Sequence, residues 1–493
     1  MRPDKQSHQI LNSNARLSLI NVFVPAEVDL DDTEAGTTAR FRPYRYTDLS
    51  LQLSPVNDGV IHQFPIILRG DGTPWDLGNL YLIRKFTEMA KLAPPSVATF
   101  KKIAQHLMMY LRWIEHLKNE GNEIHELHFP EAEERRVTWA YYRYLRRLLR
   151  QPEQPISLRV VKMRMQAVVN FYRGLDQWEL VESGDIENVP FQESLSGIPV
   201  VNAVGLQLIK TVKTTNFTFR VPHRETIGTI RDGGTLRPLD DEEQKILLDH
   251  LEQQKNRVFQ LMCIISLFTG ARIQTVCTLR LKDIQQLSNQ QPRHGEVLLK
   301  VGAGTGIDTK NQKNYRLHLP AMLVQALHDY THSAEAKKRR QKSFYGENEL
   351  NYVFLTSNGS PYYTSTAEIA DRQNSEFSQR VSAKDRVKFT IQEGNSVRNY
   401  LARLIDDIRK HDPDFTPFRF HDLRATFGMN FVRDADAAGI RDVRNQLKAR
   451  MGHSSFETTQ RYLNFNENNN IVRLASDFHH SRLNRFIGGL INK

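Results

Sequence analysis

The 493-residue sequence has only two cysteines, Cys263 and Cys277, which excludes a disulfide-stapled scaffold in a chain of this size. It has no apolar run long enough to cross a membrane, and its first residues do not follow the pattern of a secretory signal. With 40% hydrophobic and 25% charged residues, it cannot be wholly disordered or collagen-like. These absences predict a soluble cytoplasmic protein whose cysteines are reduced core residues.

Acidic residues are in short supply relative to basic ones. The 67 Lys and Arg exceed the 56 Asp and Glu and leave a formal net charge of +11. This excess favours a polyanionic partner, with DNA or RNA first and anionic lipid second. The charge alone is a weak signal, because many basic proteins bind no polyanion.

The hydrophobic period divides the chain, whose length leaves room for about three domains of about 150 residues. Residues 1–75 are rich in turn formers and β-branched residues, which predicts a small mixed or β-rich segment of unknown role. Residues 76–184 have a helical period, and residues 185–235 have no sustained period and are interpreted as a linker. A last domain, 236–493, begins with LRPLDDEEQ, where acidic residues occupy a first helical turn.

The helical segment is expected to form a compact bundle with basic faces. Helices are predicted at about 98–118, 137–150 and 157–174 from apolar residues three and four apart. Their basic residues either contact nucleic acid or are merely solvated surface, and the two interpretations have about equal weight. The candidate DNA contacts are Lys101, Lys102, Arg159, Lys162 and Arg164.

The last domain is predicted to be mainly helical with one β-hairpin. The hairpin is EVLLKVGAGTGIDTKNQKNYRLHLP, in which two strand-like runs flank a turn-rich stretch. The basic run KKRRQK, Lys337 to Lys342, is interpreted as a solvated loop in preference to a localisation signal or a DNA contact.

Three short motifs in this domain carry residues suited to chemistry on a phosphate. In FTGARIQTVC, Arg272 follows a Thr-Gly break and enters a new helix. In FHDLRATF, His421 and Arg424 are three apart and share a helix face. In GHSSFETTQRYL, Tyr462 follows His453 by nine residues. A bare His-x-x-Arg spacing occurs twice in the chain, so the weight lies in the surrounding residues and their order.

The order TG-x-R, HDLR-x-TF and GHSS…TT-x-RY closely resembles the tyrosine recombinase (phage integrase) family. The resemblance covers about 236–493 and, more loosely, 75–180, which looks like the family's SAM-like, all-helical core-binding domain. Before residue 75 it is negligible. The resemblance implies a site-specific recombinase that cleaves and rejoins DNA through a covalent 3′-phosphotyrosyl intermediate, without metal or nucleotide cofactor.

The family's roles match the chemistry of these residues. By resemblance, Tyr462 is the nucleophile, and a phenol with a pKa near 10 needs a base or cations to attack at neutral pH. Arg272 and Arg424 would clamp the phosphate oxygens, since guanidinium is planar and permanently charged. His421 would assist proton transfer, and His453 would hydrogen-bond the scissile phosphate.

The family also uses a hairpin lysine as general acid for the leaving 5′-oxygen. Lys310, just before the predicted return strand, fits best; Lys313 is second and Lys300 is a more distant alternative. The sequence departs from the family at Thr275, where an acidic residue usually stands three after the first arginine.

The length favours the integrase of a bacterial mobile element. The resemblance implies action on double-stranded DNA at the nucleoid as a homo-tetramer, with accessory bending or directionality proteins as further partners. Apolar residues at helical spacing after residue 470 either pack on their own domain or dock on a neighbouring subunit. The alternatives are a type IB topoisomerase or telomere-resolvase-like enzyme, and a non-catalytic DNA-binding regulator on the same scaffold.

Overall fold

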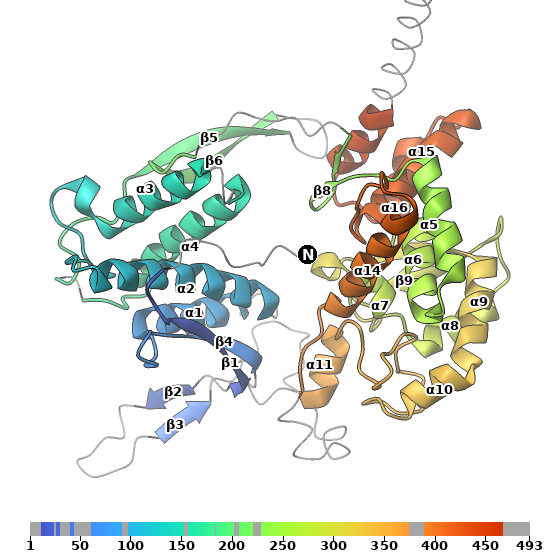
Figure 1. Ribbon diagram of the computed structural model, residues 1–493, viewed down its shortest axis with the longest axis horizontal. Helices are drawn as coiled ribbons and strands as arrows, with labels where there is room; N and C mark the ends of the chain where they lie inside the picture. The colour runs from blue at the N-terminus through green and yellow to red at the C-terminus, as the bar shows by residue number, and fades with distance from the viewer. Residues whose placement is uncertain are drawn as a thin grey trace, which may run out of the picture. The chain divides into compact units, whose positions relative to one another are not determined.

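The protein was analysed as a computed structural model (Figure 1). It describes residues 11–23, 26–29, 40–43, 61–90, 97–151, 156–182, 184–201, 207–219, 228–373 and 389–466. One compact unit comprises Met1–His223 with Gln373–Thr390, and a second comprises Arg224–Arg372 with Ile391–Lys493. Over the described ranges, no helix is both long and apolar enough to cross a membrane. The predicted C-terminal tail lies outside them.

Four helices form the body of the first unit: α1 (Asp76–Ala90), α2 (Val97–Asn119), α3 (Val137–Arg150) and α4 (Leu158–Gln177). The three predicted helices are confirmed to within a few residues. Each buries one apolar face; in α2 this face includes Phe100, Leu107 and Leu111. The helices meet at a buried aromatic centre, where the Tyr110 and Tyr172 hydroxyls lie 2.7 Å apart.

The N-terminal strands belong to the same core. β1 (Arg16–Phe23) pairs antiparallel with β4 (Ile61–Leu68), and β2 (Ala26–Asp29) pairs with β3 (Arg40–Pro43). Phe64 of β4 is fully buried in the hydrophobic cluster of the helices. The β-rich expectation for this segment is therefore confirmed, and the β1–β4 pair packs with the helical body.

The stretch interpreted as a linker contains regular structure. β5 (Glu193–Val201) and β6 (Gln207–Thr215) form a nine-pair antiparallel hairpin (Figure 1). Ser194 and Thr214 face each other across it, with hydroxyl oxygens 2.9 Å apart. Further along, β7 (Ile230–Arg231) and β8 (Thr235–Leu236) make a short second hairpin. Cross-strand hydrogen bonds stabilise these strands. Because they contain many polar residues, their sequence shows no sustained hydrophobic period.

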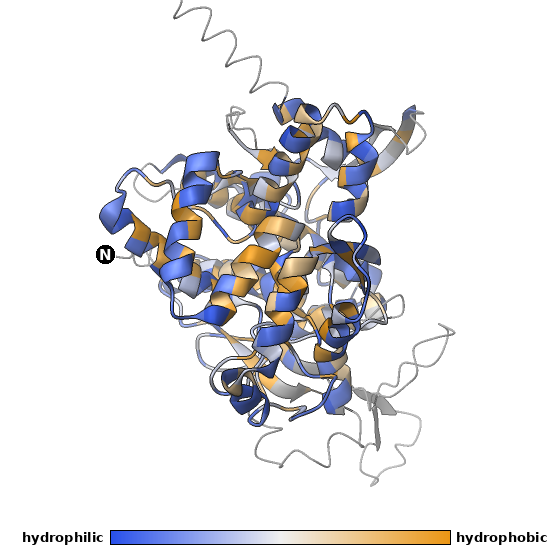
Figure 2. Cartoon of the chain, turned by 90° about the vertical axis from the view of Figure 1, so that its right-hand side faces the viewer, coloured by the Kyte–Doolittle hydropathy of each residue, from blue (hydrophilic) through white to orange (hydrophobic). Residues whose placement is uncertain are grey.

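The second unit is mainly helical, as predicted, with the one longer β-hairpin. Figure 2 shows hydrophobic and hydrophilic residues within the same helices, as expected of elements with one buried face. In chain order its longer elements are α5 (Asp241–Gln253), α6 (Arg257–Thr269), α7 (Ile273–Cys277), α8 (Leu281–Ser288), β9 (Glu296–Val301), β10 (Tyr315–Pro320), α9 (Ala321–His332), α10 (Ala334–Arg340), α11 (Thr366–Gln373), α14 (Asn395–His411), α15 (Asp422–Ala437) and α16 (Val443–Met451).

Helix α6 is the centre of this unit. Nearly all its residues are buried, and it packs against α15, α7 and β10. Cys263 on α6 and Cys277 on α7 are buried free thiols, as expected. The hairpin of β9 and β10 is antiparallel, with Tyr315 opposite Val301. These packed elements hold the ends of α7 and α15, which carry the motif arginines.

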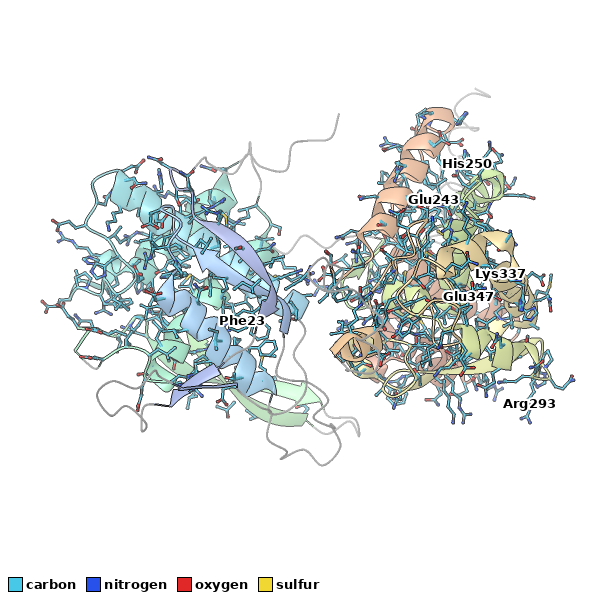
Figure 3. All side chains as sticks on the ribbon, turned by 90° about the horizontal axis from the view of Figure 1, so that it is seen from below. Phe23, Glu243, His250, Arg293, Lys337 and Glu347 are labelled. Carbon is cyan, nitrogen blue, oxygen red and sulfur yellow. The ribbon has the colours of Figure 1, made fainter. Side chains whose placement is uncertain are left out.

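The basic run KKRRQK is not a solvated loop. Most of it lies in α10, where Ser333 caps the helix by accepting a hydrogen bond from Ala336 N–H at 3.2 Å. Arg340 is buried and donates from Nε to Glu347 Oε2 at 2.9 Å. Figure 3 labels Lys337 and Glu347 in this part of the unit. The expectation was wrong because Ala, Lys and Arg favour helix and one guanidinium is used inside the fold.

Helix α5 begins with a capping box. Asp240 accepts a hydrogen bond from Glu243 N–H at 2.8 Å, and Glu243 Oε2 accepts one from Asp240 N–H at 3.1 Å. Asp240→Ala should weaken the first turn by about 1 kcal/mol, because the Glu243 N–H loses its acceptor. Hydrogen exchange of the first-turn amides should accelerate about fivefold. Asp249→Ala, on the exposed part of the same helix, is the control; equal exchange in both variants would contradict the cap's role.

Candidate active site

Arg272 is positioned by the break between α6 and α7. Gly270 ends α6 in the left-handed region with φ of 69°, and Arg272 is the N-cap of α7. A Cβ at Gly270 would lie 2.6 Å from the Phe427 ring, so both the backbone angle and the close packing require glycine. The chain thus reverses sharply and directs Arg272 toward α15.

Arg424 lies on the first turn of α15, with His421 just before it. Its guanidinium is fully buried and donates from Nη1 to Gly270 O at 2.6 Å and from Nη2 to Met451 O at 2.7 Å. These carbonyls fix two of its three nitrogens. Asp422, between the two motif residues, accepts backbone N–H bonds from Arg419 and Arg237, and this anchors the start of the helix.

His453 and Tyr462 complete the group predicted from the motifs. The His453 Nδ1 lies 2.9 Å from Thr459 Oγ1, which orients the ring. Tyr462, on the helix over residues 456–466, is fully buried and stacks with His453 at a centroid distance of 5.7 Å. A Cβ at Gly428 would lie 2.5 Å from the Tyr462 ring, so the ring packs directly against the backbone of α15.

Asp232, in the turn between β7 and β8, joins four of these groups. Its Oδ1 accepts from Arg272 Nη2 at 3.0 Å, and its Oδ2 accepts from Arg424 Nε at 2.8 Å. Oδ2 also lies 3.2 Å from His453 Nε2 and accepts the Tyr462 hydroxyl at 3.3 Å. The carboxylate is therefore the point at which two guanidiniums, an imidazole and a phenol converge.

The candidate lysines lie on or after β9. Lys310 stands in a short 3₁₀ turn, Lys310–Gln312, within the connection from β9 to β10. A Cβ at Gly233 would lie 3.1 Å from Lys310 Nζ and 3.6 Å from His421 Cε1, so both residues flank the Asp232 turn. Lys313 donates to Gly452 O at 3.0 Å, and Lys300 is exposed on β9. Lys310 therefore lies beside the turn that carries Asp232, whereas Lys313 is bonded to the backbone of the residue before His453.

Electrostatics in the group follow from burial among opposite charges. Burial alone raises the pKa of Asp232, but Arg424, His453 and Arg272 hold the pKa of this carboxyl well below its usual range. Burial and the Asp232 carboxylate raise the pKa of Tyr462 above its ordinary value. Burial, helped by the Arg424 charge, lowers the pKa of His421 to about 4. At neutral pH the site therefore holds a neutral phenol and a neutral His421 imidazole.

Two supporting residues were not predicted. Asp232 lay in the presumed linker, where no motif marked it. Thr459 is the second threonine of the TT-x-RY motif, and its role in orienting His453 appears only in that hydrogen bond. Thr275, the departure from the family pattern, donates to Asp308 O at 3.0 Å and so ties α7 to the loop before Lys310.

The candidate DNA contacts on the first unit differ in how exposed their side chains are. Lys102, Arg159 and Lys162 are exposed. Lys101 is half-buried and donates to Gln63 Oε1 at 3.1 Å. Arg164 is only 5% exposed, which corrects its prediction as a DNA contact. It lies on the buried side of α4, because the helical turn carries it round with Val161 and Met165.

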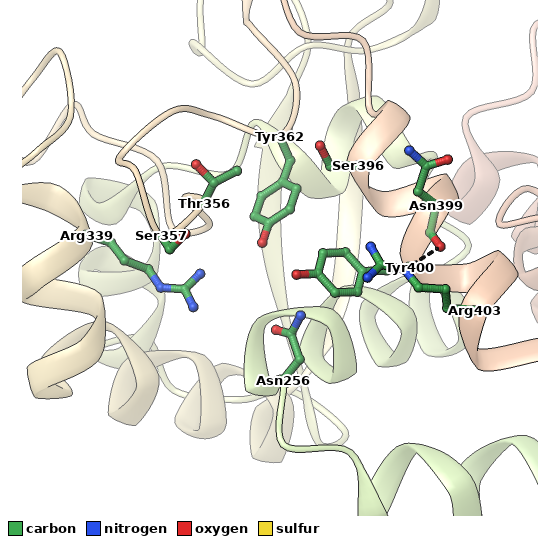
Figure 4. A pocket seen from close by; sticks show the side chains of 9 residues that line it. All are labelled: Asn256, Arg339, Thr356, Ser357, Tyr362, Ser396, Asn399, Tyr400 and Arg403. Carbon is green, nitrogen blue, oxygen red and sulfur yellow. Dashed lines mark hydrogen bonds between the residues drawn. The ribbon is translucent and has the colours of Figure 1, made fainter. Parts of the chain in front are cut away.

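A polar pocket of about 290 Å³ lies elsewhere on the second unit (Figure 4). Two arginines and two tyrosines form much of its wall, and it includes none of the motif residues. The pocket-lining residues are Asn256, Arg339, Thr356, Ser357, Tyr362, Ser396, Asn399, Tyr400 and Arg403.

Within the described part of the chain, no cluster of three or more His, Cys, Asp or Glu side chains could hold a metal ion.

Residues 237–469 match the model of the phage integrase family, and this domain is a member of that family of tyrosine recombinases. The domain is thus that of a tyrosine site-specific recombinase or integrase. No curated protein matches the sequence.

Two recombinases are similar among solved structures. The XerH site-specific recombinase, bound to palindromic difH substrate in a post-cleavage complex, is 15% identical over 78% of this chain and 81% of that one, with a TM-score of 0.42. The Tn1549 transposon integrase, in complex with circular intermediate DNA, is 14% identical over 78% and 94%, with a TM-score of 0.40. At TM-scores below 0.5, neither similarity adds to the argument.

The low pKa of His421 has a measurable consequence. Its imidazole should stay neutral from pH 8 down to about pH 5 and protonate near pH 4, whereas an exposed histidine protonates near 6.5. Because the unfolded chain takes up this proton first, the contribution of His421 to the free energy of unfolding should fall as the pH drops from about 6.5 to 4. An NMR titration, with the signal assigned by His421→Gln, tests this; a midpoint above 6 would contradict it.

Proposed function

We propose that this protein cleaves and rejoins double-stranded DNA with Tyr462 as nucleophile and Arg272, Arg424, His421, His453 and Lys310 as its active site. The observation that carries the proposal is the convergence of both guanidiniums, His453 and the Tyr462 hydroxyl on one carboxylate. A phosphodiester carries the same single negative charge as that carboxylate. Residues that converge on one anion are suited to bind the other.

In the proposed cleavage step, the Tyr462 oxygen attacks the phosphorus while the bond to the 5′-oxygen breaks. The phenolic proton passes to the neutral His421 imidazole, and Lys310 donates a proton to the leaving 5′-oxygen. A 3′-phosphotyrosyl bond and a free 5′-hydroxyl result. Attack by a 5′-hydroxyl from a second strand reverses the step and rejoins the DNA.

The two arginines stabilise the transition state in this proposal. The phosphoryl group gathers negative charge on its non-bridging oxygens as the tyrosine attacks. Arg424 is held by the carbonyls of Gly270 and Met451, so its remaining nitrogen faces the phosphate without needing to reorganise. The positive charges of Arg424 and Arg272 also favour ionisation of the phenol.

The substrate and assembly are proposals of the same kind. The excess of basic residues, 67 against 56, suits DNA, and Lys102, Arg159 and Lys162 present exposed charge on the helical unit. We assign the protein to integration or excision of a bacterial mobile element. It would act as a synaptic homo-tetramer on two duplexes, aided by accessory proteins and joined by the C-terminal tail.

Tyr462→Phe should abolish covalent attachment to DNA, because the ring remains but the attacking oxygen is gone. The test incubates the protein, in EDTA, with nicked suicide duplexes from the ends of its element and measures the protein–DNA adduct on denaturing gels. Tyr400→Phe, a partly exposed tyrosine on α14, is the matched control and should retain the adduct. An adduct that persists in Tyr462→Phe would move the nucleophile to another residue.

Lys310→Ala should slow cleavage by 10²-fold or more, since general acid catalysis contributes about 10²–10⁴-fold. A substrate with sulfur in place of the bridging 5′-oxygen should restore the rate, because a thiolate leaves without protonation. Lys313→Ala is the comparison, and its defect should not be rescued by sulfur. Rescue of Lys313→Ala alone would reassign the general acid to Lys313.

A further inference from the structure

Asp232 occupies the position that the proposed function requires for the scissile phosphate. Its two oxygens take one nitrogen from each of Arg272 and Arg424, and they also meet His453 Nε2 and the Tyr462 hydroxyl. These four groups come from three separate motifs of the sequence and share this carboxylate. While the carboxylate fills this position, 3.3 Å from the Tyr462 hydroxyl, no phosphorus can lie there for the hydroxyl to attack.

The Asp232 carboxylate accepts hydrogen bonds from only some of the buried donors of the site. Among the described residues, Arg272 Nε and His421 Nε2 are buried nitrogens without a hydrogen-bond partner. A carboxylate has two oxygens, whereas a phosphodiester has two non-bridging and two bridging oxygens arranged tetrahedrally. The unpaired nitrogens therefore match an anion with more acceptors than Asp232 offers.

The turn that carries Asp232 is built on the surface side of the group. Arg231, Gly233 and Thr235 are exposed, while Asp232 between them is 3% exposed and points inward. Gly233 has φ of 70°, and a second glycine, Gly234, follows it. The turn is held as a hairpin by the pairs of Ile230 with Leu236 and Arg231 with Thr235. From outside it, Arg461 Nη1 donates to Arg231 O at 3.1 Å and Arg419 Nη2 donates to Thr235 O. A movement of this turn would remove the carboxylate and leave the elements bearing the arginines in place.

We propose that Asp232 is an internal substrate mimic, which closes the active site in the DNA-free protein and must withdraw for the scissile phosphate to enter. This inference rests on the proposed function, because it takes the same groups as the phosphate site. The exchange replaces one singly charged anion with another, so the buried guanidiniums are never left unpaired. Cleavage in the absence of a properly bound duplex is thereby suppressed.

The competing interpretation is that Asp232 is a permanent counter-ion that holds the arginines in place during catalysis. Arg424 is already held in position by two neutral acceptors, the carbonyls of Gly270 and Met451. Asp232 instead takes its third nitrogen, together with the hydroxyl of the nucleophile. A permanent counter-ion would leave Arg424 Nε and the Tyr462 hydroxyl free to contact the substrate. Because Asp232 contacts both, the geometry favours its role as a substrate mimic.

The first test measures anion binding by the DNA-free protein. Asp232→Asn should bind orthovanadate or inorganic phosphate at least tenfold more tightly than the wild type in calorimetry, because the competing carboxylate is gone. Asp249→Asn, which removes an exposed carboxylate on α5, should match the wild type. Equal or weaker binding by Asp232→Asn would overturn the proposal in favour of the counter-ion.

The second test uses the wild-type protein and does not depend on the folding of a variant. Saturating orthovanadate should accelerate amide hydrogen exchange at least threefold in residues 230–236 as the turn is displaced, with α6 unchanged. Unchanged or slower exchange in the turn would count against the mimic. Because neither test uses DNA cleavage, a failure of the Tyr462 adduct experiment would remain distinguishable from a failure of this inference.

Discussion

The fully buried guanidinium of Arg424 and the partly buried guanidinium of Arg272 need an anion, and the rest of the site is organised around that need. Arg424 is fully buried, and Arg272 is close enough that the same carboxylate contacts both. Unpaired, such charges would cost several kcal/mol each, because the protein interior solvates them poorly. Asp232 supplies the anion in the DNA-free protein. In the proposed reaction a phosphate takes its place, and the same requirement becomes the driving force for substrate binding.

The fold meets this requirement with backbone carbonyls and helix ends. The sharp turn at Gly270 provides a carbonyl for Arg424 and starts α7 at Arg272, so a single break positions both arginines. The end of α16 provides the Met451 carbonyl and leads directly into the His453 turn. Tyr462 packs on the backbone of α15 through Gly428. Arg424 and Tyr462 therefore lie on helices and Arg272 and His421 at helix starts, whereas Asp232 lies in a turn between two short strands.

Much of the site was predictable because its residues belong to short sequence motifs. HDLRATF places His421 and Arg424 one turn apart by helical geometry alone, and FTGAR announces a helix break before Arg272. Sequence reasoning also named Arg164 as a DNA contact, although this side chain lies on the buried side of α4. It also treated KKRRQK as a solvated loop, where Arg340 in fact pairs with Glu347 inside the fold. Basic residues have long side chains, so sequence pattern alone does not decide which way they point.

The sequence by itself determined the class of domain, its helical character, the hairpin and the five motif residues, since each depends on short-range order along the chain. Only the tertiary structure decided that residues 193–215 form a hairpin and that Asp232 meets groups 40 to 230 residues away. The physical reason is that a carboxylate in a polar, aperiodic stretch carries no pattern of its own. Its importance comes from the cations that the fold brings to it.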